Sequence, residues 1–296
     1  MTGADERREL VVGIDPSRNW HLSLAWAADE AHRRGLELRL VVAVPPLHDT
    51  HPRDDSPRRA SLLQAGSNAL QEGAGWVRAR HPQLQPTTSL LDGYPAAVIG
   101  GLSGRARMVV LGSRHLSRTA EYLSAGSLVV PVTAQARCPV VVVGDAEHVS
   151  QQPTYLVVGI DGSEFSKAAL GLAFEEADLR GAALRAVSVW QPPIFALHDE
   201  RDAVQAQRRM LSETTAGWSL KYPDVHLTHE VPTGHPVEEL ASASEHALAV
   251  VVGRRGRGGY TGMRLGSVVH GLLHRAHCPV ITVPLLGGRA ADCRDR

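Results

Sequence analysis

Short apolar blocks and longer, mostly polar blocks alternate along the chain. In the second half the apolar blocks are of strand length, and strands are expected over 155–160, 184–190, 225–231, 248–252 and 279–283. The segments between them have helical spacing, and helices are expected over 201–222, 237–246 and 267–274. Another helix is expected after the first of these strands, because Ser163 can cap its start and Gly181 its end.

The two halves of the chain repeat one another. The segment Val-Val-Gly-Ile-Asp at 11–15 returns at 157–161, 146 residues later, and Cys-Pro-Val at 138–140 returns at 278–280, 140 residues later. Such ordered similarity predicts two copies of one domain. With the boundary in the polar stretch 145–154, the domains are expected at 1–146 and 153–287, followed by a polar tail at 288–296.

Strands that alternate with helices predict an α/β fold. In each domain we expect a five-stranded parallel sheet that is doubly wound, or Rossmann-like, with helices on both faces. Ligands of such sheets bind beyond the carboxyl ends of the strands. Asp161 follows the first strand of the second domain and Gly253 follows the fourth, so both are expected to face one crevice.

Composition narrows the function. The 296 residues carry 31 basic and 31 acidic side chains, so no global field would attract nucleic acid or an anionic membrane. Apolar stretches are too short to span a bilayer, and the N-terminus lacks the apolar core of a signal peptide. We therefore expect a cytoplasmic protein. Three cysteines make no disulfide framework, and neither of the two lysines stands in a Walker A loop.

A glycine-rich loop after the strand at 248–252 is the main chemical signal. It reads Gly253-Arg254-Arg255-Gly256-Arg257 and is followed by Gly266-Ser267, where a helix is expected to begin. Glycines let backbone N–H groups approach an anion, and the N-terminus of a helix favours negative charge. The loop therefore predicts a phosphate site, and the alternative is a turn that serves the fold alone.

The spacing Gly-x2-Gly-x9-Gly-Ser resembles the ATP-binding signature of the universal stress protein family. The resemblance extends over almost the whole chain, including the segment 159–163, the turn at 234–236 and Cys-Pro-Val at 278–280. It implies a five-stranded parallel sheet whose last strand pairs with that of another domain. In a tandem protein the two domains would then form an internal pseudo-dimer.

The resemblance also implies an adenine-nucleotide site in the second domain. Its residues would be Asp161, Gly162, Val189, Gly253, Arg254, Gly256, Arg257, Gly266, Ser267 and Val268. Asp161 would lie near ribose and adenine, the backbone of Val189 would read the adenine edge, and Arg257 would cover the phosphates, with Mg²⁺ as a companion ion. For Arg254 the alternative is an exposed loop position in an arginine-rich protein.

The first domain departs from the signature. His115 replaces the second glycine, the spacing from there to Gly126 is one residue longer, and Glu121 adds negative charge. A second, weakened site is expected at Asp15, Ala43, Gly112, Arg114, Gly126 and Ser127. The alternative is that His115 donates to a phosphate and the site still binds.

Three functions fit this pattern. The family resemblance favours a stress-response sensor or regulator, whose nucleotide occupancy alters how it pairs with itself, as a homodimer, or with a partner protein. A slow ATPase is the second, although the sequence shows no positioned general base and no catalytic residue is assigned. A nucleotide-free interaction module is the third. His270 and His274 share a helical face, but a solvated face explains them better than a metal site.

Overall fold

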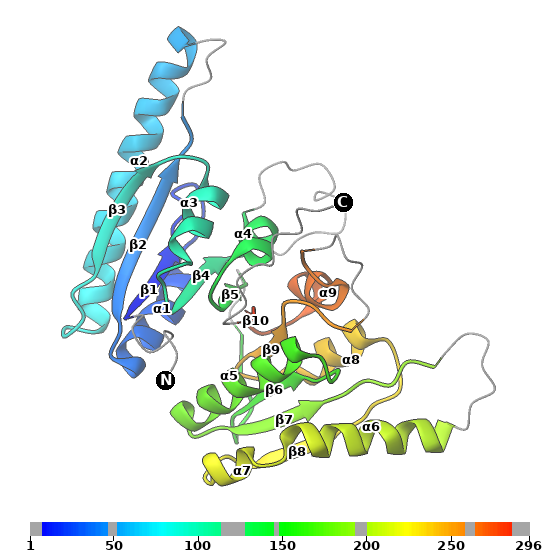
Figure 1. Cartoon of the computed structure of the whole chain (residues 1–296). Helices are drawn as coiled ribbons and strands as arrows, with labels where there is room; N and C mark the ends of the chain where they lie inside the picture. The colour runs from blue at the N-terminus through cyan, green and yellow to red at the C-terminus, as the bar shows by residue number, and fades with distance from the viewer. Residues whose placement is uncertain are drawn as a thin grey trace.

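The computed structural model describes residues 8–46, 52–113, 128–144, 148–192, 200–257 and 264–285. In the first half the elements are β1 (Glu9–Gly13), α1 (His21–Arg34), β2 (Glu37–Val44), α2 (Pro52–Arg80), β3 (Thr87–Asp92), α3 (Pro95–Leu102), β4 (Met108–Gly112), α4 (Val129–Gln135) and β5 (Val140–Val143). In the second half they are β6 (Tyr155–Gly159), α5 (Glu164–Arg180), β7 (Ala183–Val187), α6 (Glu200–Thr215), α7 (Trp218–Lys221), β8 (Leu227–Glu230), α8 (Pro236–Ala243), β9 (Val250–Gly253), α9 (Ser267–Arg275) and β10 (Val280–Val283). The predicted α/β class is confirmed (Figure 1).

One sheet of ten strands runs through both halves in the order β3-β2-β1-β4-β5-β10-β9-β6-β7-β8. Neighbouring strands are parallel within each half, whereas β5 and β10 pair antiparallel at the centre, with Ile281 opposite Val141. The last strands of the two halves therefore join them. This is the predicted internal pseudo-dimer, and Figure 1 shows the halves on either side of β5 and β10.

Helices cover both faces of the sheet, which explains why its inner strands are apolar throughout. All four residues of β5 and of β10 are buried. On one face α1, α2, α5 and α6 pack over a single apolar cluster that crosses from one half to the other. On the opposite face α3, α4, α8 and α9 pack over a second cluster that also spans both halves. Continuous cores on both faces make the two halves one packed body.

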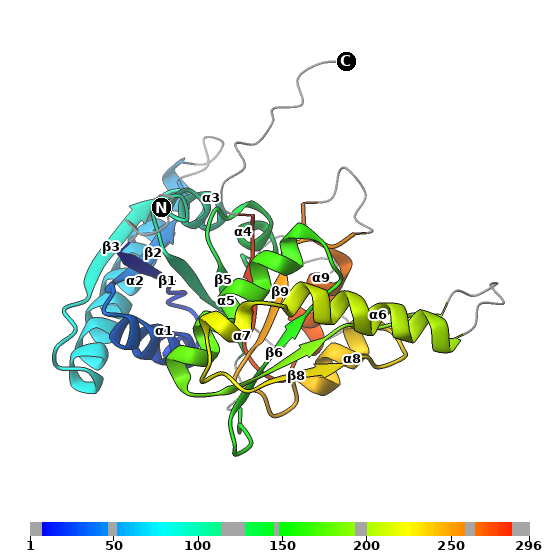
Figure 2. The ribbon, with the colours of Figure 1, turned by 60° about the horizontal axis from the view of Figure 1, so that its bottom comes forward.

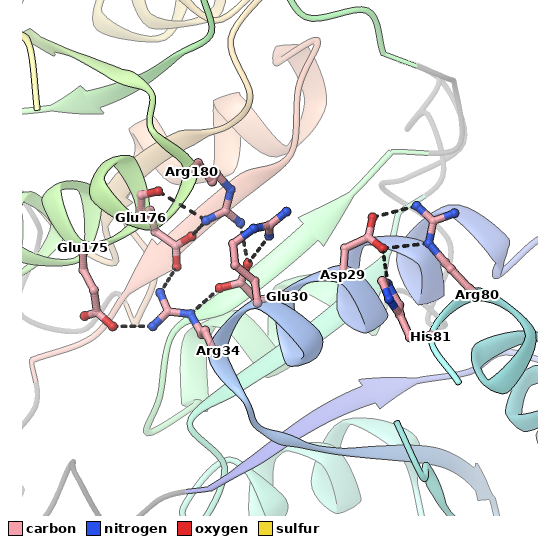
Figure 3. A network of polar contacts seen from close by, with 9 residues as sticks. Asp29, Glu30, Arg34, Arg80, His81, Glu175, Glu176 and Arg180 are labelled. Carbon is pink, nitrogen blue, oxygen red and sulfur yellow. Dashed lines mark hydrogen bonds and ion pairs between the residues drawn. The ribbon is translucent and has the colours of Figure 1, made fainter. Parts of the chain in front are cut away.

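A closed ring of four buried charges joins the halves where α1 and α5 meet. Figure 2 shows the two helices next to one another, and Figure 3 shows the charged side chains. Arg34 pairs with Glu30 on its own helix and with Glu176 on α5, at 2.5 Å for the latter. Arg180 likewise pairs with Glu176 on its own helix and with Glu30 on α1, at 2.5 Å for the latter. The members of each half stand 146 residues from their counterparts, so the ring follows the pseudo-twofold symmetry of the molecule.

The capping predictions for α5 are confirmed. The Ser163 hydroxyl accepts a hydrogen bond from the backbone N–H of Ser166 at 3.2 Å, and Gly181 ends the helix with φ of 59°. The strand predicted over 184–190 is too long, since β7 ends at Val187 and Trp190 forms only an isolated bridge.

The prediction of a single helix over 201–222 is wrong. Gly217 adopts φ of 83° and separates α6 from the short α7. This left-handed conformation is open to glycine and interrupts the helical hydrogen bonds. Trp218 and Tyr222 then stack on Phe174 of α5, with ring centroids 5.4 and 5.7 Å away. Tertiary packing of the aromatic rings therefore accompanies a break that helical periodicity alone did not indicate.

Candidate functional site

Two backbone hydrogen bonds fix the base of the glycine loop after β9. The N–H of Arg254 donates to the carbonyl of Val283 at 2.8 Å, and the N–H of Gly266 donates to the carbonyl of Arg254 at 2.9 Å. The second bond brings the two ends of the loop together. A Cβ on Gly266 would lie 3.8 Å from the backbone nitrogen of Gly256. The second glycine of the signature therefore lies beside the start of α9.

The start of α9 adds further backbone donors to this place. Ser267 and Val268 are its first two residues, and the first N–H groups of a helix have no partner within it. No acidic residue stands in the first turn of α9, which the structure describes throughout. The helix dipole there favours an anion.

Two glycines of the loop are required by close contacts. A Cβ on Gly253 would lie 2.6 Å from the carbonyl carbon of Phe165, so the absence of a side chain lets α5 pack against the loop. A Cβ on Gly256 would lie 2.5 Å from Oδ2 of Asp161. Gly253 thus serves the packing of the fold, whereas Gly256 lets the loop approach the carboxylate at the end of β6.

Asp161 ties the end of β6 to the glycine loop. Its Oδ2 accepts from the backbone N–H of Arg257 and its Oδ1 from that of Ser163, both at 2.9 Å. Burial opposes ionisation of this carboxyl, but the hydrogen bonds from Ser163 and from Arg257 outweigh it and hold its pKa below the ordinary value. The strand ends predicted to face one crevice therefore meet through a charged carboxylate.

Arg257 also lies against the turn that follows Asp161. Gly162 has φ of 77°, and a Cβ there would lie 2.5 Å from a terminal nitrogen of the Arg257 guanidinium. The left-handed conformation favours glycine at this turn, and the small residue leaves room for the Arg257 side chain. The cation therefore lies beside the junction of β6 and the loop.

The other two loop arginines have different partners. Arg254 Nη1 donates to the carbonyl of Ala136 in the first half at 2.8 Å. Burial, and after it the charges of Arg255 and Arg264, lower the pKa of Arg254. The guanidinium of Arg255 lies 5.0 Å from the ring centroid of Phe165. The side chain of Arg254 crosses to the other half. Only the backbone of Arg254 therefore lies in the loop where the nucleotide contact was predicted.

Val189 lies just beyond the end of β7. The N–H groups of its neighbours Ser188 and Trp190 donate to the carbonyls of Glu230 and Pro232, both at 3.0 Å. Backbone groups along an extended strand point alternately to its two sides. Those of Val189 therefore point away from these carbonyls, toward the side of β6 and Asp161.

The matching residues of the first half are arranged differently. Asp15 pairs through Oδ2 with Arg18 Nε at 2.7 Å, whereas the counterpart of Arg18 in the second half is Glu164. Ala43 lies within β2 opposite Leu91, and Gly112 ends β4. Arg114, His115, Glu121, Gly126 and Ser127 lie outside the described residues. Of the predicted weak site the structure thus describes only Asp15, Ala43 and Gly112. The charge of Asp15 is neutralised there by Arg18.

Comparison with known proteins shows which family this chain belongs to. The model of the universal stress protein family matches residues 6–144 and again 155–284. The chain belongs to the universal stress protein family. Two universal stress proteins of Mycobacterium tuberculosis are 34% and 33% identical over 292 and 291 residues, and each alignment covers 95% of this chain and 98% of the relative. A universal stress protein from Archaeoglobus fulgidus, 19% identical, shares the fold with a TM-score of 0.71 over 94% of this chain and 97% of its own.

Two contacts of this universal stress protein were missed by sequence reasoning. The hydrogen bond from Arg257 to Asp161 joins residues 96 positions apart, and the one from Arg254 to Ala136 joins residues 118 positions apart. For the second contact the sequence contains no signal, since alignment of the repeats shows only that Ser113 holds the position of Arg254 in the first half. For the first contact the sequence contains only the expectation that the two strand ends share a crevice.

Proposed function

We propose that the second half binds an adenine nucleotide, with ATP as the first candidate, and that the protein is a nucleotide-responsive regulator. The observation that supports this proposal best is that three features meet at one point. Gly256, the first turn of α9 and Asp161 lie together at the carboxyl ends of β6 and β9. Backbone donors suit phosphate, and a carboxylate suits ribose hydroxyls.

In this proposal each group has a distinct task. The N–H groups of Gly256, Ser267 and Val268 hold the phosphates, and Arg257 neutralises their charge. Asp161 accepts from the ribose, and the backbone of Val189 pairs with the adenine edge. A phosphate that takes the Arg257 N–H displaces the Asp161 carboxylate from it, because two anions cannot share one donor.

Occupancy of this site would reach the domain interface through Arg254. The loop that holds the phosphates also carries the side chain that donates to Ala136 of the first half. A change in the loop would therefore change a contact between the halves, and with it the surface offered to a second copy or to a partner. We propose the cytoplasm as the location. In the first half we propose weaker binding, because Arg18 already neutralises Asp15.

The decisive measurement is calorimetric titration of the purified protein with ATP, with and without Mg²⁺, alongside its nucleotide content. We expect about one nucleotide per chain, and loss of most of the binding in Gly256→Asp, because its side chain would meet the Asp161 carboxylate with bulk and like charge and force the loop away from the end of β6. Gly75→Asp is the matched control, because a side chain there meets nothing within 4 Å. Gly266→Glu should repeat the loss.

Alternative functions give different results. No binding to the wild type would overturn the proposal and favour a nucleotide-free interaction module. About two nucleotides per chain would contradict the weakened first site, and a change at Gly126 would then remove half of the binding. Turnover that is lost in Gly256→Asp would favour an ATPase, whereas equal turnover in both proteins would indicate contamination.

A further inference from the structure

A cavity of about 240 Å³ lies between the two halves. Its walls come from α1, from the ends of β4 and β5, and from the carboxyl end of α9, and they include Trp26, Asp29, Ser113, His148 and Ala276. One buried water needs only about 15 Å³ of such space. The cavity is therefore large enough for a small organic group, and it lies apart from the crevice at Asp161.

Pseudo-symmetry relates this cavity to a place that is filled. The N–H of Ser113 donates to Val143 at 2.7 Å, as that of Arg254 does to Val283 at 2.8 Å. Ala276 ends α9, just as Ala136 ends α4. The pair of Ser113 and Ala276 is thus the counterpart of the pair of Arg254 and Ala136 across the central strands.

The two places differ in one side chain. On one side the guanidinium of Arg254 reaches across the interface and donates to the carbonyl of Ala136 at 2.8 Å. On the other side Ser113 is too short to reach Ala276, and both residues line the cavity. The filled side shows which chemical group this geometry accepts. It is a planar cation that donates to the last carbonyl of a helix.

The walls of the cavity suit such a cation. The carboxyl end of α9 carries partial negative charge. Asp29 adds an acceptor but no uncompensated charge, because Arg80 pairs with both oxygens of its carboxylate and His81 lies 2.7 Å from one of them (Figure 3). Trp26 contributes an aromatic ring, and the Arg180 guanidinium already lies 5.8 Å from the centroid of this ring. His148 Nε2 lies 2.7 Å from the carbonyl of Ala247 and must donate to it, so its Nδ1 is an acceptor in the neutral ring.

We propose that this cavity is a binding site for a small molecule with a guanidinium group, whose cation takes the place that Arg254 occupies on the other side. The group donates to the carbonyl of Ala276 and lies near Asp29. The site is independent of the nucleotide proposed for the second half, because its walls exclude the glycine loop.

Methylguanidinium is the probe, titrated into the nucleotide-free protein by calorimetry. The wild type is expected to bind one ion per chain. Ser113→Arg fills the cavity with the protein's own guanidinium and should bind none. Arg254→Ser opens the counterpart and should bind two, and the double variant should bind one again. Methylurea, which is planar but neutral, should not bind to any of them.

Three results would overturn the proposal. The first is that methylguanidinium shows no saturable binding to the wild type. The second is that it binds equally to the wild type and to Ser113→Arg. The third is that methylurea binds as well as methylguanidinium. If Ser113→Arg does not fold, Arg254→Ser decides the question, because an unchanged stoichiometry in that variant contradicts the assigned equivalence. A crystal structure of the wild type with methylguanidinium should place the ion between Ser113 and Ala276, and a different position would also contradict it.

Discussion

The last residues of β9 and β4 show how the presence or absence of one Cβ atom decides a local structure. Gly253 and Gly112 hold the same place in the two repeats. A Cβ on Gly253 would lie 2.6 Å from backbone of Phe165, whereas one on Gly112 would meet only the side chain of Ser23, at 3.4 Å. Equivalent sequence positions therefore tolerate a side chain differently.

Gly253→Ala is expected to lower the free energy of unfolding by about 1–3 kcal/mol, because helix α5 must move away from the loop. Gly112→Ala should change it by less than about 1 kcal/mol, since a hydroxyl side chain can shift. Urea unfolding of both variants, monitored by circular dichroism, measures this. Equal losses in the two variants would refute the assigned role of Phe165.

The Asp161 carboxylate gives a prediction that depends on pH. Its pKa is lower in the folded protein, so its contribution is fully present above the pKa of the unfolded chain, about 3.9, and is lost as pH falls through the folded value. Asp161→Asn should lower the free energy of unfolding by about 1 kcal/mol at pH 7, as one charged acceptor is lost.

Urea unfolding at pH 7 and at pH 3 compares the two proteins. The difference between wild type and Asp161→Asn should shrink at the lower pH, because below about 3.9 the carboxyl takes up a proton in the unfolded chain, which favours unfolding of the wild type. A difference that stays constant would mean that the charge of Asp161 contributes nothing to folding.

Among the elements, α1 and α5 are joined by charge as well as by apolar packing. Glu30 and Glu176 are fully buried, and Arg34 and Arg180 retain 9% and 11% exposure. Burial and the neighbouring Glu30 raise the pKa of Glu176, whereas Arg180 and Arg34 overcome burial and lower the pKa of Glu30. The ring is therefore stable only with both arginines present.

Arg34→Met is expected to lower the free energy of unfolding by about 3–5 kcal/mol, because Glu30 and Glu176, both fully buried, must then share Arg180 as the one cation of the ring. Arg18→Met, which removes an exposed pair with Asp15, should cost less than about 1 kcal/mol. Chemical denaturation measures both. Replacing Glu30 as well as Arg34 by apolar residues should recover part of the loss, and an additive loss would show that the ring members are not coupled.

At the scale of the whole molecule, a pseudo-twofold axis relates the two halves. The surface by which one half contacts the other can therefore also pair with a second copy of the same half. An isolated second half, 153–287, would expose β10, whose four residues are buried in the full chain. A bare apolar edge strand pairs readily with another. Glu176 and Arg180 repeat the pattern of Glu30 and Arg34, so two copies could also rebuild the ring.

The isolated half is therefore expected to form a dimer through β10 and α5. Light scattering coupled to size exclusion measures its mass. Arg180→Glu should weaken this dimer, because it places like charges in the ring, and circular dichroism confirms that the variant is folded. A folded monomer of the unmodified half would contradict the expectation.

The sequence alone determined the α/β class, the tandem repeat and the caps of α5, because these depend on local periodicity, on repeated segments and on single residues such as Ser163 and Gly181. It also predicted that Asp161 and the glycine loop after Gly253 follow strand ends that face one crevice. Only the tertiary structure decided the break at Gly217 and the crossing of Arg254 to Ala136, and only it revealed the cavity at Ser113. Each of these depends on packing between segments far apart along the chain, and periodicity within one segment does not contain that information.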